Sequence, residues 1–205
     1  MGRPVRRADS RGDGVFVIFK KTKLRDAYIV DIQPYQDERG FFARTWCRNE
    51  LSAQSLDANL AQCSVSFNRR AGTLRGMHLQ LPPHAETKLV RCTRGAFYDV
   101  IIDLRTDSRS YMQWIGVELT AENHRALYVP KGFAHGFMTL ADNTEALYMI
   151  SDFYAPEAAR GIRWDDEQFG ITWPAAVNVI SEKDLSYAAY EAAAFRLTVA
   201  TTTNK

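Results

Sequence analysis

The chain has 205 residues, of which 46% are hydrophobic, and this is enough for one domain with a substantial core. Its 26 basic and 24 acidic residues nearly cancel, so the net charge of +2 excludes the strong field expected of a protein that binds nucleic acid or an anionic membrane. No run approaches the roughly 18–20 apolar residues of a membrane helix, and the N-terminus lacks the apolar core of a signal peptide. We therefore predict a cytoplasmic protein that does not bind membranes.

The two ends of the chain differ in composition from the part between them. Residues 1–14 are rich in Arg, Gly and Asp, which predicts a flexible N-terminal arm. Residues 196–205 form a Thr-rich polar tail. The folded domain is predicted to occupy residues 15–195.

Short apolar runs follow one another from residue 15 onward, separated by Gly, Pro, Asp or Asn. Runs rich in Val, Ile, Tyr and Phe between such turn-formers predict β-strands. No regular helical pattern lies between neighbouring runs, which favours an antiparallel sandwich or barrel over βαβ units. The predicted strands are 15–19, 28–32, 41–46, 60–67, 89–94, 96–104, 114–119, 125–129, 136–140 and 146–150.

Helical stretches are few. Good helix formers at 48–59 and an Ala- and Glu-rich segment at 186–195 predict two short helices. Both lie outside the main succession of strands. The predicted fold class is therefore all-β, a jelly-roll barrel with a few short peripheral helices.

Three cysteines, Cys47, Cys63 and Cys92, stand at positions without CxxC spacing. An odd number with this spacing argues against a disulfide framework and against a zinc knuckle. We predict reduced, buried thiols.

Two of the four histidines, His78 and His135, stand in apolar, strand-like segments. A histidine can accept or give a proton near neutral pH, so each is a candidate base. A lone histidine in an apolar run is more often a core residue bonded to a backbone carbonyl, so the context of each must decide. Strand alternation predicts Gly76 on the same face as His78, with Arg75 and Met77 on the other. Gly76 would let a ligand approach the backbone closely.

Three further charged residues belong to apolar strands. Lys88 begins one of them, and its side chain points either into the barrel or into solvent. Asp99 and Asp103 interrupt the next strand on one face, so at least one carboxylate needs a buried partner unless that strand lies at a wet edge.

Other site signals are weaker or absent. Tyr148 and Tyr154 are either packing residues with a polar end or functional phenols. No HxH pair occurs, so we predict no catalytic metal. No GxSxG, P-loop or GxGxxG occurs either, which leaves acid–base chemistry or ligand binding as the function.

Taken together, a series of motifs between about residues 24 and 187 resembles the dTDP-4-dehydrorhamnose 3,5-epimerase family in order and spacing. Any one motif is weak, but the series is specific. The motifs are DERGFF (37–42), LRGMHLQ (74–80), KLVRCTRGAFYDVIIDLR (88–105), VPKGFAHGF (129–137), LYMISDFYAPE (147–157), RGIRWDD (160–166) and ISEKD (180–184).

The resemblance implies a cupin-type jelly roll that acts as a homodimer without metal or redox cofactor. The implied substrate is a nucleotide-diphosphate 4-keto-6-deoxyhexose, in dTDP-rhamnose and polysaccharide biosynthesis. His78 matches the family's base, Asp184 the carboxylate that orients it, and Tyr148 the proton donor on the opposite ring face. The implied reaction inverts C3 and C5 of dTDP-4-keto-6-deoxyglucose through an enolate-like intermediate, giving dTDP-4-keto-rhamnose.

The resemblance also implies a set of substrate-binding residues and shows three departures. Arg44 stands where many members have Glu, Ser64 where many have Asn, and Ala159 where many have Glu. These places are associated with the outer parts of the substrate, so a CDP or GDP carrier stays open beside dTDP. The implied substrate-binding residues are Arg39, Gln62, Ser64, Arg75, Lys88, His135, Tyr154 and Lys183.

Two alternative functions remain open at this point. The same base and donor suffice for an epimerase that acts at C3 or at C5 alone. A jelly roll can also bind a sugar without catalysis, because a fold by itself does not establish an activity.

Overall fold

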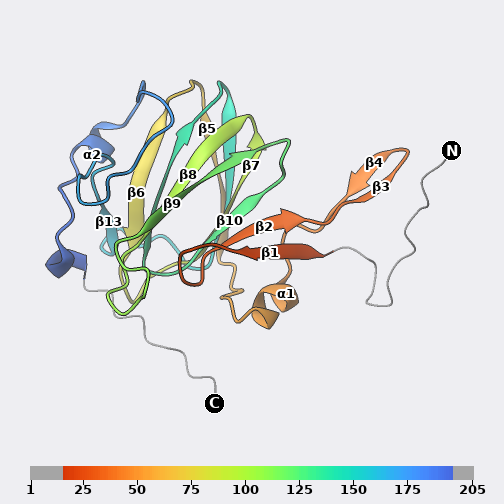
Figure 1. The fold of residues 1–205 in the computed structure, drawn as a ribbon, viewed down its shortest axis with the longest axis horizontal. Helices are drawn as coiled ribbons and strands as arrows, with labels where there is room; N and C mark the ends of the chain where they lie inside the picture. Colours follow the sequence, from red (N-terminus) through yellow and green to blue (C-terminus); the bar gives the residue numbers. More distant parts are fainter. Residues whose placement is uncertain (1–15, 196–205) are drawn as a thin grey trace, which may run out of the picture.

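The computed structural model describes residues 16–195, and within this range the chain forms two facing antiparallel sheets with a hairpin that projects from them (Figure 1). The predicted arm at 1–14 and the predicted tail at 196–205 lie outside the described residues, so the proposed division of the chain stays a prediction. The two-sheet arrangement confirms the all-β jelly-roll architecture.

The six-stranded sheet contains the first strands of the chain and one wall of the site. Each pair of neighbours in it is antiparallel. Its strands, in spatial order, are β1 (Val17–Lys21), β2 (Tyr28–Ile32), β10 (Ala126–Val129), β7 (Lys88–Arg94), β12 (Thr144–Ile150) and β5 (Gln62–Asn68).

The five-stranded sheet packs its inner face on the first sheet. Strand β11 lies between β6 and β8, and all seven of its residues are buried, including the polar His135 and Thr139. The strands, in spatial order, are β13 (Ala159–Gly161), β6 (Leu74–Gln80), β11 (Phe133–Thr139), β8 (Ala96–Asp103) and β9 (Trp114–Thr120).

In the part of the chain that the structure describes, the hydrophobic core has three parts. Phe97, Leu127 and Phe137 belong to the part that joins the inner faces of the two sheets. A second part covers the outer face of the five-stranded sheet with the C-terminal segment, including Phe169 and Tyr190. The third packs α1 (Arg48–Ala53) and the chain after it against the six-stranded sheet.

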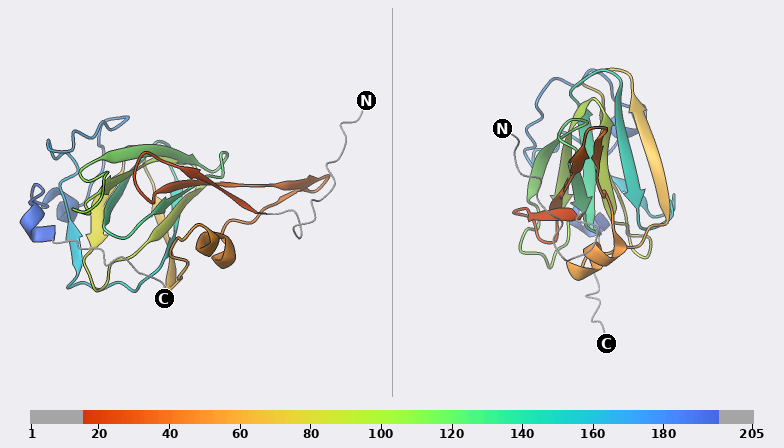
Figure 2. Two further views of the ribbon diagram at one scale, coloured as in Figure 1. Left: turned by 60° about the horizontal axis from the view of Figure 1, so that its bottom comes forward. Right: turned by 90° about the vertical axis from the view of Figure 1, so that its right-hand side faces the viewer.

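A short hairpin of β3 (Tyr35–Asp37) and β4 (Gly40–Phe42) extends away from both sheets (Figure 2). The predicted strand 41–46 overlaps β4 only at its start. Beyond Phe42 the chain leaves the hairpin, and Trp46 packs beside α1 instead of pairing with another strand. The remaining predicted strands overlap observed strands. β3, β6 and β13 lie outside the predicted ranges, although the segment around His78 was expected to be strand-like.

The helices differ from the prediction in extent and place. α1 ends at Ala53 rather than at residue 59, because the backbone turns at Ser55 (φ 59°) and returns the buried Leu56 toward Leu51. The expected helix at 186–195 is wrong. α2 (Glu182–Leu185) precedes it, and only η1 (Ala192–Phe195) falls inside it, because packing of the intervening chain overrides the helix propensity of Ala.

The position of β8 decides between the two alternatives predicted for Asp99 and Asp103. The edge-strand alternative is wrong, since β8 lies between β11 and β9, and both Asp99 and Asp103 are fully buried. The Asp103 carboxylate accepts hydrogen bonds from Arg105, Ser108 and Ser110, which satisfy its charge within the fold. The thiol prediction holds for Cys92 only: Cys63 is exposed, because its side chain points away from the inner face of β5, and Cys47 is partly buried.

A β-bulge between β6 and β11 changes the direction of the side chains that precede it. His135 pairs with His78, but Phe137 pairs with Arg75, so Gly136 opposes two residues, Gly76 and Met77. The predicted division of faces is therefore wrong: Arg75 and His78 line the same cavity, while Met77 packs in the outer core. The space that a Cβ of residue 76 would need is occupied by the backbone of Gly136.

Gly76→Ala is expected to destabilise the protein by about 3 kcal/mol or more, because Gly76 has φ +142° and an added Cβ would lie 2.5 Å from the Gly136 Cα. Gly170→Ala is the matched control, with φ +58° and no atom within 4 Å of the added Cβ, and should cost only about 1 kcal/mol. Urea unfolding measures both. Equal losses would show that the approach of β6 and β11 is not constrained at this point.

Candidate active site

A cavity of about 300 Å³ lies between the two sheets. A second cavity of about 210 Å³ adjoins it, since both are lined by His78, Lys88 and Ile150. One wall comes from β5, β7 and β12 of the six-stranded sheet, and the other comes from β6 and β11. The larger cavity is lined by Ser64, Ser66, Arg75, His78, Lys88, His135, Phe137, Tyr148 and Ile150.

His78 and Asp184 form a hydrogen-bonded pair at the point where the two cavities meet. The Nε2 atom of His78 lies 2.8 Å from Oδ1 of Asp184, and the second carboxylate oxygen accepts the Gly76 amide at 3.2 Å. Asp184 is placed by α2, whose N-cap Ser181 accepts the Asp184 amide. The ring of Tyr187 meets the His78 ring edge-on, with centroids 5.9 Å apart.

The protonation state of this pair follows from its surroundings. Burial by itself raises the pKa of the Asp184 carboxyl, but the hydrogen bond and charge interaction with His78, with smaller contributions from Gly76 and Ser181, hold that pKa below its usual value. Asp184 is therefore ionised near neutral pH and accepts a hydrogen bond from the nearer ring nitrogen of His78. The other nitrogen of His78 keeps a lone pair, as a general base requires.

A second histidine–carboxylate pair lies deeper. The Nε2 atom of His135 is 2.6 Å from Oδ1 of Asp99, and both side chains are buried. The ring of Tyr148 packs edge-on against His135 with centroids 5.9 Å apart. Burial, and then the Asp99 carboxylate, raise the pKa of the Tyr148 phenol well above its usual value, while Arg75 lowers it in part. Tyr148 is thus protonated at neutral pH and can donate.

Two cations reach the cavity from opposite sheets. Arg75 is oriented by a 2.7 Å hydrogen bond from its Nε to Oδ1 of Asn68. The Lys88 side chain is only 12% exposed, which decides its two predicted alternatives in favour of the barrel interior. Its ammonium lies 3.0 Å from Oε1 of Glu86. Negative charge that develops on a ligand here meets fixed positive groups in a partly dehydrated space.

Among residues 16–195, no group of three or more His, Cys, Asp and Glu side chains has an arrangement that could hold a metal ion. None of the helices in the same range is long and apolar enough to cross a membrane.

The family model for dTDP-4-dehydrorhamnose 3,5-epimerase matches residues 21–192. The chain belongs to this family. It is therefore an enzyme of the isomerase class, an epimerase, and the sequence resemblance is confirmed.

Relatives and solved structures agree with this assignment over most of the chain. The dTDP-4-dehydrorhamnose 3,5-epimerase of Sinorhizobium fredii is 41% identical over 169 residues, which cover 82% of this chain and 87% of the relative. The Bacillus anthracis epimerase, solved with TDP and PPi bound, has a TM-score of 0.82 and 38% identity and covers 85% of this chain and 100% of that one. The Legionella pneumophila epimerase, solved with dTDP-4-keto-L-rhamnose, has a TM-score of 0.79 and 33% identity over 85% and 93%.

The structure brings most of the predicted site residues of this epimerase together. Asp184 lies directly behind His78, and Ala159, one of the noted departures, also lines the site. The predicted residues that line the two cavities are Gln62, Ser64, Arg75, His78, Lys88, His135, Tyr148, Tyr154 and Lys183.

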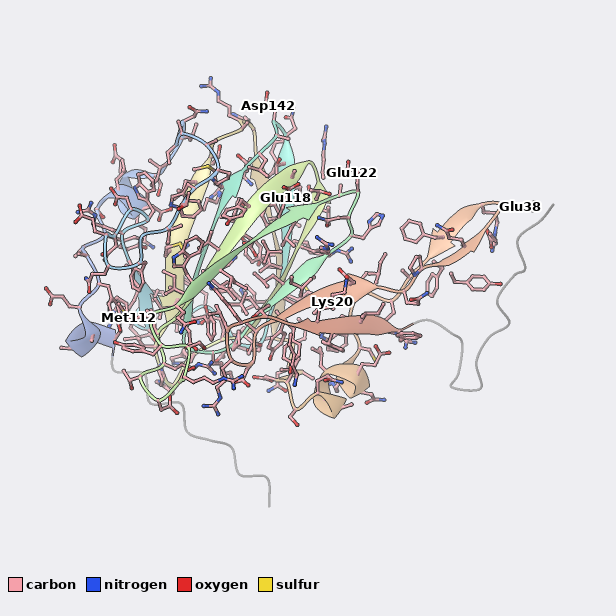
Figure 3. All side chains as sticks on the ribbon, viewed as in Figure 1. Lys20, Glu38, Met112, Glu118, Glu122 and Asp142 are labelled. Carbon is pink, nitrogen blue, oxygen red and sulfur yellow. The ribbon has the colours of Figure 1, made fainter. Side chains whose placement is uncertain are left out.

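Arg39 is the predicted site residue that lies elsewhere. It stands on the projecting hairpin with its side chain 85% exposed and paired with Asp37. The neighbouring Glu38 marks the tip of the hairpin, well away from the sheets (Figure 3). Arg44 donates to Glu50 of α1 at 2.6 Å and does not line either cavity.

Several lining residues were not singled out in the sequence. Ser66 follows Gln62 and Ser64 on the same face of β5, so strand alternation contained the signal for it. Glu86 likewise stands two residues before Lys88. Tyr187 and Arg160 reach the smaller cavity from irregular or very short segments, where no periodicity indicates the direction of a side chain.

Asp184→Asn should remove a stabilising contribution that depends on pH. Because the folded-state pKa of Asp184 is lowered, its contribution is present above the unfolded value of about 4 and is lost as pH falls below it. The difference in unfolding free energy between wild type and variant should therefore be large at pH 7 and shrink below about pH 4. Urea unfolding across pH 2.5–7 measures it, and parallel curves would contradict the ionised pair.

Proposed function

We propose that the enzyme inverts C3 and C5 of dTDP-4-keto-6-deoxyglucose with His78 as the base and Tyr148 as the proton donor. The observation that carries this proposal is the placement of the two residues. His78, with its ionised partner Asp184, comes from one sheet, and the protonated Tyr148 comes from the facing sheet, with both lining one cavity. Inversion at a carbon needs removal on one face and delivery on the other.

The base chemistry starts from the acidity of a proton beside a ketone. The free ring nitrogen of His78 takes that proton, and the carboxylate of Asp184 stabilises the imidazolium that forms. The electron pair moves to the C4 oxygen. Lys88 and Arg75 supply positive charge in the same cavity, which stabilises the enolate-like species.

The return of a proton completes the inversion. The phenol of Tyr148 delivers it from the other wall, and the buried His135–Asp99 pair fixes the ring of Tyr148 by edge-on packing. We assign Gln62, Ser64, Tyr154 and Lys183 to the outer sugar and the diphosphate; they line the two cavities around this centre. The proposed mechanism uses no metal or redox cofactor.

Exchange in deuterated water is the test. We expect the wild type to place deuterium at C3 and C5 of dTDP-4-keto-6-deoxyglucose, which NMR detects. His78→Asn should lower the exchange rate roughly 10²–10⁴-fold, because the base is lost. Tyr148→Phe should still exchange protons but not invert, since His78 can return a deuteron to the face from which it took the proton.

The other outcomes are informative. Deuterium at one carbon would indicate an epimerase that acts at C3 or C5 only. No exchange with the dTDP sugar would direct the assay to the CDP and GDP analogues. Retention of the biological role by His78→Asn would indicate a sugar-binding protein without catalysis.

We further propose a homodimer in which the β3–β4 hairpin of each subunit reaches the site of the other. An isolated two-stranded hairpin is marginal in water, and this one carries exposed Tyr35, Phe41 and Phe42. The same hairpin presents Arg39 at a distance from its own cavity (Figure 3). The fork of an arginine suits a phosphate pair, so a second copy would supply the missing contact to the diphosphate.

Complementation between two impaired variants tests this arrangement, with the substrate kept well below the raised KM of Arg39→Ala. Arg39→Ala should raise KM, and His78→Asn should abolish turnover. Mixed subunits should regain activity, because a heterodimer contains one site with His78 from one subunit and Arg39 from the other. The expected recovery is about a quarter of wild-type activity when dimers form at random. A monomer in sedimentation, or no recovery after subunits have exchanged, would contradict the proposal.

The substrate also bears on location. A nucleotide-diphosphate sugar carries charges that the membrane interior excludes, so we propose that the enzyme works in the cytoplasm. Fractionation followed by the exchange assay checks this.

A further inference from the structure

Glu86 is a charged wall residue of the smaller cavity for which the function above gives no role. It lies in the loop that enters β7, two residues before Lys88. Its side chain is only 6% exposed, although the cavity is open to ligand. A carboxylate removed from water to this extent needs a compensating partner.

That partner is Lys88. Oε1 of Glu86 lies 3.0 Å from the Lys88 ammonium, and both side chains are largely buried. In such surroundings an ion pair is screened little, and removal of one member leaves the other uncompensated. The flexible four-carbon stem of a lysine does not fix its ammonium by itself, so the carboxylate restricts where the charge can lie.

The second oxygen of Glu86 strengthens this assignment. Oε2 is buried and has no hydrogen-bond partner among residues 16–195. Within that range, Lys88 is thus the charged partner of the carboxylate, and Oε2 has no competing hydrogen bond. Lys88 in turn lines both cavities and sits where they meet, beside His78.

We propose that Glu86 is a positioning residue that holds the Lys88 ammonium at the place where the C4 oxygen becomes negatively charged. This inference rests on the proposed epimerisation. Glu86 acts through Lys88 and not by contact with the sugar. Its contribution is greatest after proton removal, when the ketone oxygen carries charge, so it belongs to the transition state more than to binding.

Glu86→Gln keeps the size of the side chain and removes its charge. In the exchange assay we expect kcat to fall by roughly tenfold with KM nearly unchanged, as for loss of one hydrogen bond to a charged group. The matched control is Glu118→Gln, which makes the same change at an exposed position on β9 (Figure 3). It should leave both constants unchanged.

A double-mutant cycle with Lys88→Met separates action through Lys88 from direct contact. Lys88→Met keeps the length of the side chain and removes its charge. Once the ammonium is absent, the change of Glu86 to Gln should alter kcat by less than about twofold. A further tenfold loss in that background, or a rise in KM instead of a fall in kcat, would overturn the positioning role and indicate that Glu86 contacts the substrate.

Thermal unfolding tests the pair without substrate. Lys88→Met should lower Tm, because it leaves the Glu86 carboxylate buried and unpaired, and the double variant should recover part of the loss. Equal Tm values for Lys88→Met and the double variant would overturn the pairing. Failure of the wild type to exchange deuterium would instead reject the proposed reaction, and with it the catalytic role of the pair.

Discussion

The site depends on one close backbone contact, the approach of β6 to β11 at Gly76 and Gly136. With no Cβ on either residue, the strands come near enough for a bulge in which Gly136 opposes Gly76 and Met77. The extra residue of the bulge shifts the alternation of side chains between the two faces of β6. Arg75 consequently lies on the inner face with His78. A regular ladder would direct Arg75 outward and leave the base without this neighbouring cation.

The cavity walls combine burial with paired charge. His78 has Asp184, His135 has Asp99, and Lys88 has Glu86, so three of the wall residues are each held by a carboxylate. Pairing of this kind permits ionisable groups inside a sandwich, where an isolated charge would be expensive. The same dehydration raises the pKa of Tyr148 and keeps its proton available. The surroundings that the fold provides thus lower the pKa of Asp184 and raise the pKa of Tyr148.

The projecting β3–β4 hairpin is the segment on which the proposed homodimer depends. Its aromatic side chains are exposed, and its arginine lies away from the cavity of its own chain. A surface of this kind is costly unless another surface covers it. The proposed exchange of hairpins would remove that cost and place Arg39 where a diphosphate could be bound, so that catalysis and dimerisation depend on the same segment.

The sequence by itself determined the all-β class, most strand positions and many of the wall residues, because strand periodicity and ordered motifs are local properties. It failed where distant contacts decide the outcome: the helix at 186–195 yields to packing around Tyr190, Cys63 is exposed, and Arg75 changes face at the bulge. The partners of Lys88 and Asp99, and the distance of Arg39 from the cavity, were likewise decided only by the tertiary structure. Burial and pairing depend on which strands meet across the sandwich, and no local pattern encodes that meeting.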